Sequence, residues 1–73
     1  MVNGERVRQV RELLNLTQAQ LAKRIDVAQA AIAKIESGEL RPSDTLVQAL
    51  SLTTGFPVDF FHKNNGPNIP LGS

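Results

Sequence analysis

Residues 17–46, TQAQLAKRIDVAQAAIAKIESGELRPSDTL, decide the fold of this chain. Thr17 and Gln20 have the spacing of a capping box, in which each side chain bonds a backbone amide of the other, so a helix is predicted to begin here. That helix should stop near Asp26, and another is expected over roughly residues 28–36. The connection between them is so short that the two helices must cross steeply, as in a helix-turn-helix.

The sequence on either side of this stretch predicts further helices and no strand. Apolar residues recur at helical spacing over residues 4–14 and 44–54, and a short last turn is expected over residues 58–61. Asn3 and Ser43 are suitable N-caps, and the residues suited to helix ends are Asn15, Gly38 and Gly55. The side chains expected to point inward are Val7, Val10, Leu14, Leu21, Ala22, Ile25, Ala28, Ala31, Ile32, Ile35, Leu46, Val47, Leu50 and Ser51. The predicted fold is all-α, a compact bundle of four to five helices over residues 1–61 with a flexible tail over residues 62–73.

Length and composition narrow the class of protein. A chain of 73 residues forms one small domain, and without cysteine it has neither disulfides nor a thiolate metal site. A reducing cytoplasm is therefore the expected location. No apolar run approaches the roughly 20 residues of a membrane span, so no membrane partner is expected. The net charge is only +1, so any argument for nucleic-acid binding must come from where the charges lie.

The outer face of the predicted 28–36 helix is unusual for a solvated helix. At roughly 100° per residue, Ala30, Ala33, Lys34 and Ser37 lie opposite the buried isoleucines, and Gln29 lies at the exposed N-terminal end. This face is small and nearly uncharged, so it can approach another surface closely. A DNA major groove about 12 Å wide admits such a helix. The alternative interpretation is an alanine-rich stretch that merely favours helix formation.

The quoted stretch resembles the Cro/repressor-type helix-turn-helix of the xenobiotic-response-element (XRE) family. The similarity covers roughly residues 4–61 and rests on Thr-Gln, Leu-Ala, the core Ile, Glu-x-Gly and Pro-Ser at matching spacing. It implies a lambda-repressor-like fold, with Gln18 holding a phosphate and steadying the recognition helix, and with Gln29 reading adenine. Backbone amides around residues 37–39 would grip a further phosphate with Arg41. The full set of implied DNA-binding residues is Thr17, Gln18, Ala28, Gln29, Ala30, Ala33, Lys34, Ser37 and Arg41.

Arg11 and Glu36 require a separate interpretation. Each lies at the edge of the apolar stripe of its own helix, where a charge is unfavourable unless it is paired. The resemblance implies a partly buried ion pair that joins the first and third helices, so both residues are interpreted as structural.

This chain also departs from the family pattern. Asp26 stands where the family has a turn glycine, and Ala28 replaces a serine cap. Because the recognition face is mostly alanine, hydrogen-bonded reading of each half-site should be modest, with symmetry and DNA shape carrying more of the specificity.

The predicted function is sequence-specific binding of double-stranded DNA by a bacterial transcriptional regulator. We expect a homodimer on a palindromic operator, without enzymatic activity, metal, cofactor or small-molecule ligand. The dimer contact is expected in the Leu52–Phe61 region, because Phe60 and Phe61 cannot easily both point inward from one short turn. The alternative is a protein-interaction or dimerisation module of a larger regulator or antitoxin, with little DNA binding of its own.

The C-terminal residues suggest that a longer protein follows. Residues 54–61 resemble the ending of XRE domains that are fused to a zinc-peptidase-like domain in some bacterial and phage regulators. The H-E-x-x-H motif of such domains is absent here, and His62, the only histidine, is interpreted as a solvated linker residue. Apolar character returns at residues 69–71, as if another element began there.

Overall fold

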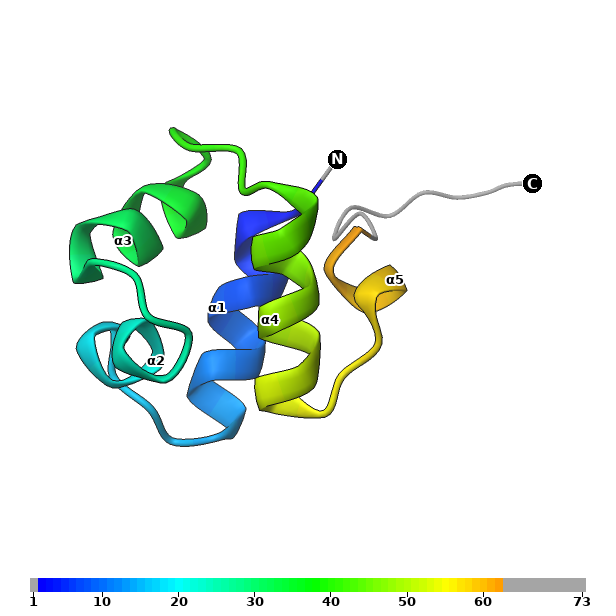
Figure 1. The fold of residues 1–73 in the computed structure, drawn as a ribbon, viewed down its shortest axis with the longest axis horizontal. Coiled ribbons are helices and arrows are strands. Elements are labelled where there is room, and N and C mark those ends of the chain that lie inside the picture. Colours follow the sequence, from blue (N-terminus) through cyan, green and yellow to red (C-terminus); the bar gives the residue numbers. More distant parts are fainter. Residues whose placement is uncertain (1, 63–73) are drawn as a thin grey trace.

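A computed structural model of the chain describes residues 2–62, and all regular structure within them is helical (Figure 1). The helices are α1 (Gly4–Leu13), α2 (Gln18–Arg24), α3 (Gln29–Ser37), α4 (Asp44–Thr54) and α5 (Val58–His62). Helix α3 packs against α1 and α2, whereas α5 packs against α1 and α4. The predicted all-α bundle is confirmed. Of the expected tail, His62 instead completes α5, and residues 63–73 lie outside the described residues.

Side-chain caps begin three of these helices where the sequence predicted them. Asn3 Oδ1 accepts from the Glu5 amide at 3.0 Å, and Ser43 Oγ accepts from the Leu46 amide at 3.2 Å. The capping box of α2 is complete: Thr17 Oγ1 accepts from the Gln20 amide at 3.0 Å, and Gln20 Oε1 accepts from the Thr17 amide at 2.8 Å. These bonds satisfy amides that a helix start would otherwise leave without a partner.

Left-handed residues end the helices and turn the chain. Gly38 and Gly55 have φ of 88° and 81° and are the C-caps of α3 and α4, as predicted. Asn15 follows α1 with φ of 62°. Asp26 has φ of 61°, a conformation that favours glycine, in the turn between α2 and α3. Asp26 therefore adopts the left-handed backbone conformation at the position where the family has a glycine.

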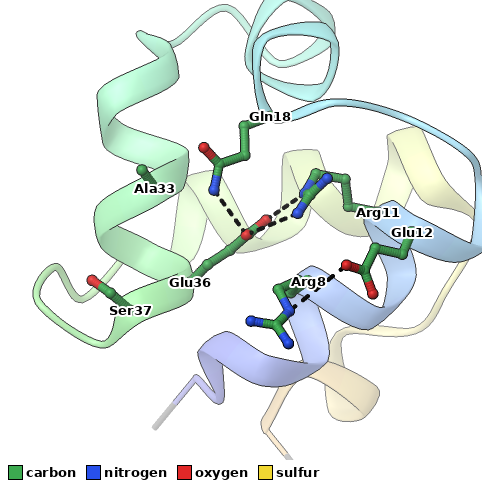
Figure 2. Close-up of a pocket in the computed structure, with 7 residues that line it drawn as sticks. All are labelled: Arg8, Arg11, Glu12, Gln18, Ala33, Glu36 and Ser37. Atoms are coloured by element: carbon green, nitrogen blue, oxygen red, sulfur yellow. Dashed lines mark hydrogen bonds and ion pairs between the residues drawn. The ribbon is translucent and has the colours of Figure 1, made fainter.

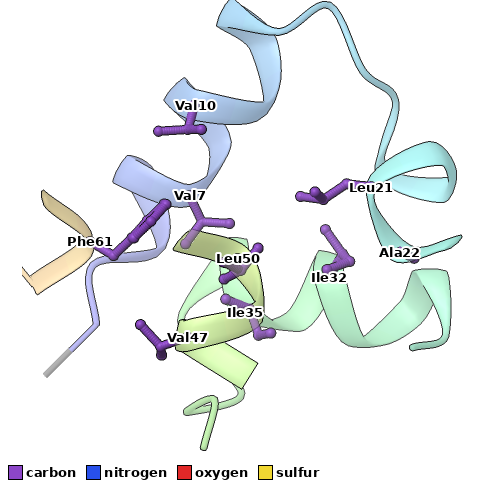
Figure 3. Close-up of a cluster of buried hydrophobic side chains, with 9 residues drawn as sticks. All are labelled: Val7, Val10, Leu21, Ala22, Ile32, Ile35, Val47, Leu50 and Phe61. Atoms are coloured by element: carbon purple, nitrogen blue, oxygen red, sulfur yellow. The ribbon is translucent and has the colours of Figure 1, made fainter. Parts of the chain in front are cut away.

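Nine side chains form the buried core (Figure 3). They are Val7, Val10, Leu21, Ala22, Ile32, Ile35, Val47, Leu50 and Phe61. Every helix contributes to this cluster, so the core fixes α3 relative to the rest of the bundle.

Several residues that were predicted to be buried in the core are exposed or only half-buried. Leu14 is 40% exposed because it is the C-cap of α1, beyond the last helical residue. Ala28 is exposed because it is the N-cap of α3 and has extended backbone, so helical periodicity does not apply to it. The positions that are only half-buried are Ile25, Ala31, Leu46 and Ser51.

The two phenylalanines of α5 are buried to different extents, because both cannot point inward from one short turn. Phe61 is fully buried, and its carbonyl oxygen accepts from the Asn3 amide at 2.7 Å. The half-buried Phe60 ring packs 5.2 Å from the Phe56 ring, centroid to centroid, and the Arg6 guanidinium lies 4.6 Å from its centroid. Because Phe56 and Arg6 pack against its ring, Phe60 does not form the exposed apolar surface expected for a dimer contact. The exposed apolar side chain of this region is Leu52, at 86%.

Candidate nucleic-acid interface

The α2–α3 pair presents one face of α3 outward. The Val27 amide donates to the Ala22 carbonyl at 2.9 Å and closes the turn between the two helices. Ile32 and Ile35 are buried beneath α3, while Ala33 is half-buried at the edge of the outer face. The exposed side chains of α3 are Gln29, Ala30, Lys34 and Ser37. The predicted outer face is therefore present, apart from the partial burial of Ala33.

Three of the predicted residues share a shallow hollow beside this face. Gln18, Ala33 and Ser37 line it together with Arg8, Arg11, Glu12 and Glu36 (Figure 2). Arg41 lies elsewhere, in a hollow between the N-terminal residues and the loop that follows α3. Thr17 and Ala28 are exposed at the starts of α2 and α3. The fold thus places the predicted set in more than one region.

Arg11 and Glu36 form the ion pair across α1 and α3. Arg11 Nε donates to Glu36 Oε2 at 2.7 Å, and Arg11 Nη2 donates to Glu36 Oε1 at 3.2 Å. The side chains are 13% and 5% exposed, respectively. The hydrogen bond to Glu36 raises the pKa of Arg11, against an opposing effect of burial. A third bond, from Arg11 Nη1 to the Leu16 carbonyl at 2.9 Å, ties the pair to the chain between α1 and α2.

Two glutamines extend this ion pair to the N-terminus of α3. Gln18 Nε2 donates to Glu36 Oε1 at 3.0 Å, and Gln29 Nε2 donates to Gln18 Oε1 at 2.9 Å. The side chain expected to read a base is therefore connected, bond by bond, to the pair between α1 and α3. Sequence reasoning identified all four residues and the Arg11–Glu36 ion pair, but not the two bonds of Gln18 that join this pair to Gln29.

The loop after α3 differs from the expected phosphate grip. The Gly38 amide donates to the Ile35 carbonyl at 3.2 Å, and the Glu39 amide donates to the Lys34 carbonyl at 2.9 Å. The Ser37 hydroxyl also donates to the Lys34 carbonyl, at 3.1 Å. These donors bond the last carbonyl groups of α3. In this conformation, the Arg41 side chain is therefore the one group of the expected phosphate grip that stays available for a phosphate.

Arg8 is a candidate that sequence reasoning missed. Its side chain is 58% exposed, lines the hollow with Gln18, and lies 3.8 Å from Glu12 (Nε to Oε2) (Figure 2). The available signal was its position three residues before Arg11, which places both on one side of α1. Arg8 adds a cation beside the α3 face.

Among residues 2–62, no group of three or more His, Asp or Glu residues is placed to hold a metal ion. No helix in this part of the chain is long and apolar enough to cross a membrane.

The steep α2–α3 pair and its outward α3 face define a helix-turn-helix protein. A family model described as helix-turn-helix matches residues 7–61, and the chain belongs to this family, of the Cro/C1 (XRE) type. No relative was found among curated protein sequences.

Solved structures agree with this assignment. The P22 c2 repressor in complex with a synthetic operator is 33% identical, with a TM-score of 0.77, and the match covers 84% of this chain and 92% of that one. The solution structure of the P22 c2 DNA-binding domain is 32% identical, with a TM-score of 0.79 and coverage of 89% and 86%. PlcR of Bacillus thuringiensis, solved with the peptide PapR7 and DNA, is 32% identical, with a TM-score of 0.73. That match covers 81% of this chain but 21% of PlcR.

Proposed function

We propose that this chain is the DNA-binding domain of a transcriptional regulator and that α3 enters the major groove of its operator. The observation that carries the proposal is the exposed face of α3, which is small, nearly uncharged and bordered by polar side chains at the start of α2. The similar P22 c2 repressor and PlcR were each solved in complex with DNA. The proposed role is that of a non-enzymatic, cytoplasmic regulator.

Each residue near this face has a proposed task. Gln29 reads adenine, because a glutamine amide matches the N6 and N7 atoms of adenine in the major groove. The exposed methyl groups of Ala28 and Ala30, and the half-buried Ala33, face the base edges, where alanine can contact a thymine methyl. Lys34 contacts either the backbone or a guanine, and Ser37 lies at the end of the same face.

Phosphate contacts are proposed on both sides of α3. Gln18 donates one amide hydrogen to Glu36, which leaves its second amide hydrogen for a phosphate. Thr17 lies beside it at the start of α2. Arg8 and Arg41 supply cationic contacts from the two hollows. Phosphate contacts of this kind position the protein but carry no sequence information.

A homodimer on a palindromic operator is proposed because a single α3 makes too few base contacts to select a site. Two copies about 34 Å apart would double those contacts. Leu52, near the end of α4, is the exposed large apolar side chain of the Leu52–Phe61 region and is the proposed centre of the dimer contact.

Salt dependence of binding tests this function. A preferred duplex is first selected from a random-sequence pool, and its affinity is then measured by fluorescence anisotropy at several salt concentrations. With about three to five phosphates neutralised per monomer, the slope of log K against log salt should be about −5 to −9 for a dimer. Arg8→Gln and Arg41→Gln should each flatten it by about one.

The matched control removes the same charge elsewhere. Arg24 lines a separate hollow with Leu16 and Lys23, toward the far end of α2 from Gln18. Arg24→Gln should therefore leave the slope within error. A wild-type affinity that does not change with salt, or a pool that yields no preferred sequence, would overturn the proposal.

A further inference from the structure

The turn between α1 and α2 carries an exposed apolar area outside the core. Leu13 and Leu14, at the end of α1, are 70% and 40% exposed. The half-buried Leu16 extends this area into the turn. Single exposed leucines need no explanation, but contiguous ones mark a surface that another molecule covers. In Figure 1 the turn lies at the lower left of the molecule, on the side away from α5.

Opposite charges lie on the two sides of these leucines. Glu12 lines a hollow with Leu13 on α1. Lys23 and Arg24 line a second hollow with Leu16, on α2. Because Leu13 and Leu16 are three residues apart, their Cα atoms lie within about 11 Å of each other. The two hollows therefore flank one continuous surface. This turn surface consists of Glu12, Leu13, Leu14, Leu16, Lys23 and Arg24.

Local structure does not account for the acidic side of the turn surface. The dipole of α2 favours Lys23 and Arg24 in its last turn, although neither forms an ion pair within residues 2–62. Glu12 lies in the last turn of α1, where the dipole disfavours a carboxylate. Its contact with Arg8 is 3.8 Å long, between side chains that are both more than half exposed, so it contributes little. Glu12 thus stands against the preference of its own helix.

The turn surface is complementary to a second copy of itself. In a two-fold contact, a residue that meets a given residue of the other copy is met by that same residue in return. With the leucines at the axis, Glu12 of each copy faces Lys23 and Arg24 of the other. Opposite charges then meet at both ends of the contact. A partner of one sign, such as a DNA backbone, would instead be repelled at one end.

We propose that the turn surface is a self-association surface, through which one copy of this domain contacts another. It shares no residue with the Leu52–Phe61 region of the proposed homodimer. Six residues a side are far fewer than the about 20–30 of a stable interface, so the contact is weak in free solution. It becomes occupied where another interaction holds two copies at about millimolar effective concentration.

This contact leaves the α3 face free. At about 100° per residue, Gln20 and Lys23 lie about 200° and 140° around α2 from Gln18, whose side chain bonds Glu36 beside that face. The cations of the turn surface and the proposed DNA contact therefore use different sides of α2. Copies bound at neighbouring DNA sites would keep the turn surface available to each other. That consequence rests on the proposed function, whereas the self-association itself does not.

Charge reversal in the absence of DNA tests the contact. Amide chemical shifts of isotope-labelled domain are followed while unlabelled protein is added to about 2 mM. In wild type, the amides of the turn surface should shift with concentration and give an association constant. Glu12→Lys should lower that constant more than about tenfold, and so should Lys23→Glu combined with Arg24→Glu, because like charges then meet at both ends of the contact.

Mixing the two reversed proteins should restore the association. The lysine introduced at position 12 then faces the glutamates introduced at positions 23 and 24, while the native cations of one protein face the native Glu12 of the other. Damage to the fold by either substitution would not be repaired by mixing, so the recovery is specific to the contact. A mixture that stays as weak as its components, or wild-type shifts that do not depend on concentration, would refute the proposal.

Two controls and a substitute complete the experiment. Glu39→Lys reverses an exposed charge in the loop after α3, and Leu52→Ser removes an exposed leucine from α4, so both should keep the wild-type constant. An equal loss in Glu39→Lys would show a mere effect of net charge and count against the contact. If a reversed protein fails to fold, Leu13→Ser replaces it and should also weaken association, and an unchanged constant there would be equally contrary. Because no DNA is present, failure of the proposed function would leave this result unaffected.

Discussion

Gly4 is the position at which one added methyl group should do most damage. It is the first residue of α1, and a Cβ built on it would meet the Ile35 carbonyl oxygen and lie 2.7 Å from the Glu36 carbonyl oxygen. Both obstructing atoms belong to the backbone of α3, so no side-chain rotation can relieve the contact. The start of α1 is also held from the other side, because the Asn3 amide donates to the Phe61 carbonyl at 2.7 Å.

The size of the effect follows from two opposing terms. In a helix, replacing glycine by alanine normally stabilises by about 0.5–1 kcal/mol, through a smaller loss of backbone entropy. Here α1 and α3 must instead separate until the Cβ reaches ordinary van der Waals contact at 3.4–4 Å. Such overpacking costs about 1–3 kcal/mol, and the two fixed backbones favour the upper part of that range. We expect Gly4→Ala to lower the free energy of unfolding by about 2 kcal/mol, or about 8–16 °C in Tm.

Thermal and urea unfolding followed by circular dichroism measure this change. Gly55→Ala is the comparison, because its Cβ meets nothing within 4 Å and its cost comes only from φ of 81°. That conformation costs an alanine about 1 kcal/mol, so Gly55→Ala should be the milder of the two. A Gly4→Ala protein with the wild-type Tm, or a higher one, would show that α1 does not approach α3 as closely as described.

Three other substitutions test separate parts of the structure. Ala28→Ser supplies the cap that α3 lacks, since Ala28 is an N-cap without a side-chain bond, and should raise stability by about 1 kcal/mol in urea unfolding; an unchanged midpoint would argue against that assignment. Glu36→Ala leaves Arg11, whose side chain is 13% exposed, without its partner, and should cost about 3 kcal/mol; a Tm within a degree or two of wild type would show the pair to be solvated. Leu52→Ser should leave Tm nearly unchanged, because the side chain is 86% exposed, yet weaken self-association on operator DNA in sedimentation; undiminished dimerisation would place the contact elsewhere.

Sequence periodicity predicted the helices because their caps and apolar spacing are local features. The capping box at Thr17 needs residues only three apart, and the buried isoleucines of α3 recur within one turn. The two core residues that are exposed instead lie where helical geometry ends. Leu14 and Ala28 were assigned inward by a helical wheel, but both are capping residues without helical backbone, so the wheel misplaced them. Periodicity describes only the residues inside a helix.

The interface was less predictable, because its details depend on how distant segments meet. Gln18 and Glu36 are eighteen residues apart, and their bond depends on the crossing of α2 and α3. Family resemblance supplied the residues and the Arg11–Glu36 ion pair, but not the bonds that join Gln18 and Gln29 to that pair. The amides after α3 were expected to hold a phosphate, yet a left-handed Gly38 turns its own amide and that of Glu39 back onto α3. The Gly38 cap that the sequence predicted already implies this direction, because in left-handed caps the amides after the helix bond its last carbonyls.

Net charge is a poor guide to binding in this domain because of how its charges are arranged. Arg11 and Glu36 cancel in the sum of +1, and Arg8 lies 3.8 Å from Glu12. A sum of charges counts each of these two ion pairs as zero. In the fold, however, the carboxylate of the first pair also accepts a hydrogen bond from Gln18, whose own carbonyl oxygen accepts from Gln29 at the start of α3. A pair that cancels in the net charge can therefore still organise polar side chains beside the α3 face, because hydrogen-bond direction depends on which group accepts rather than on total charge.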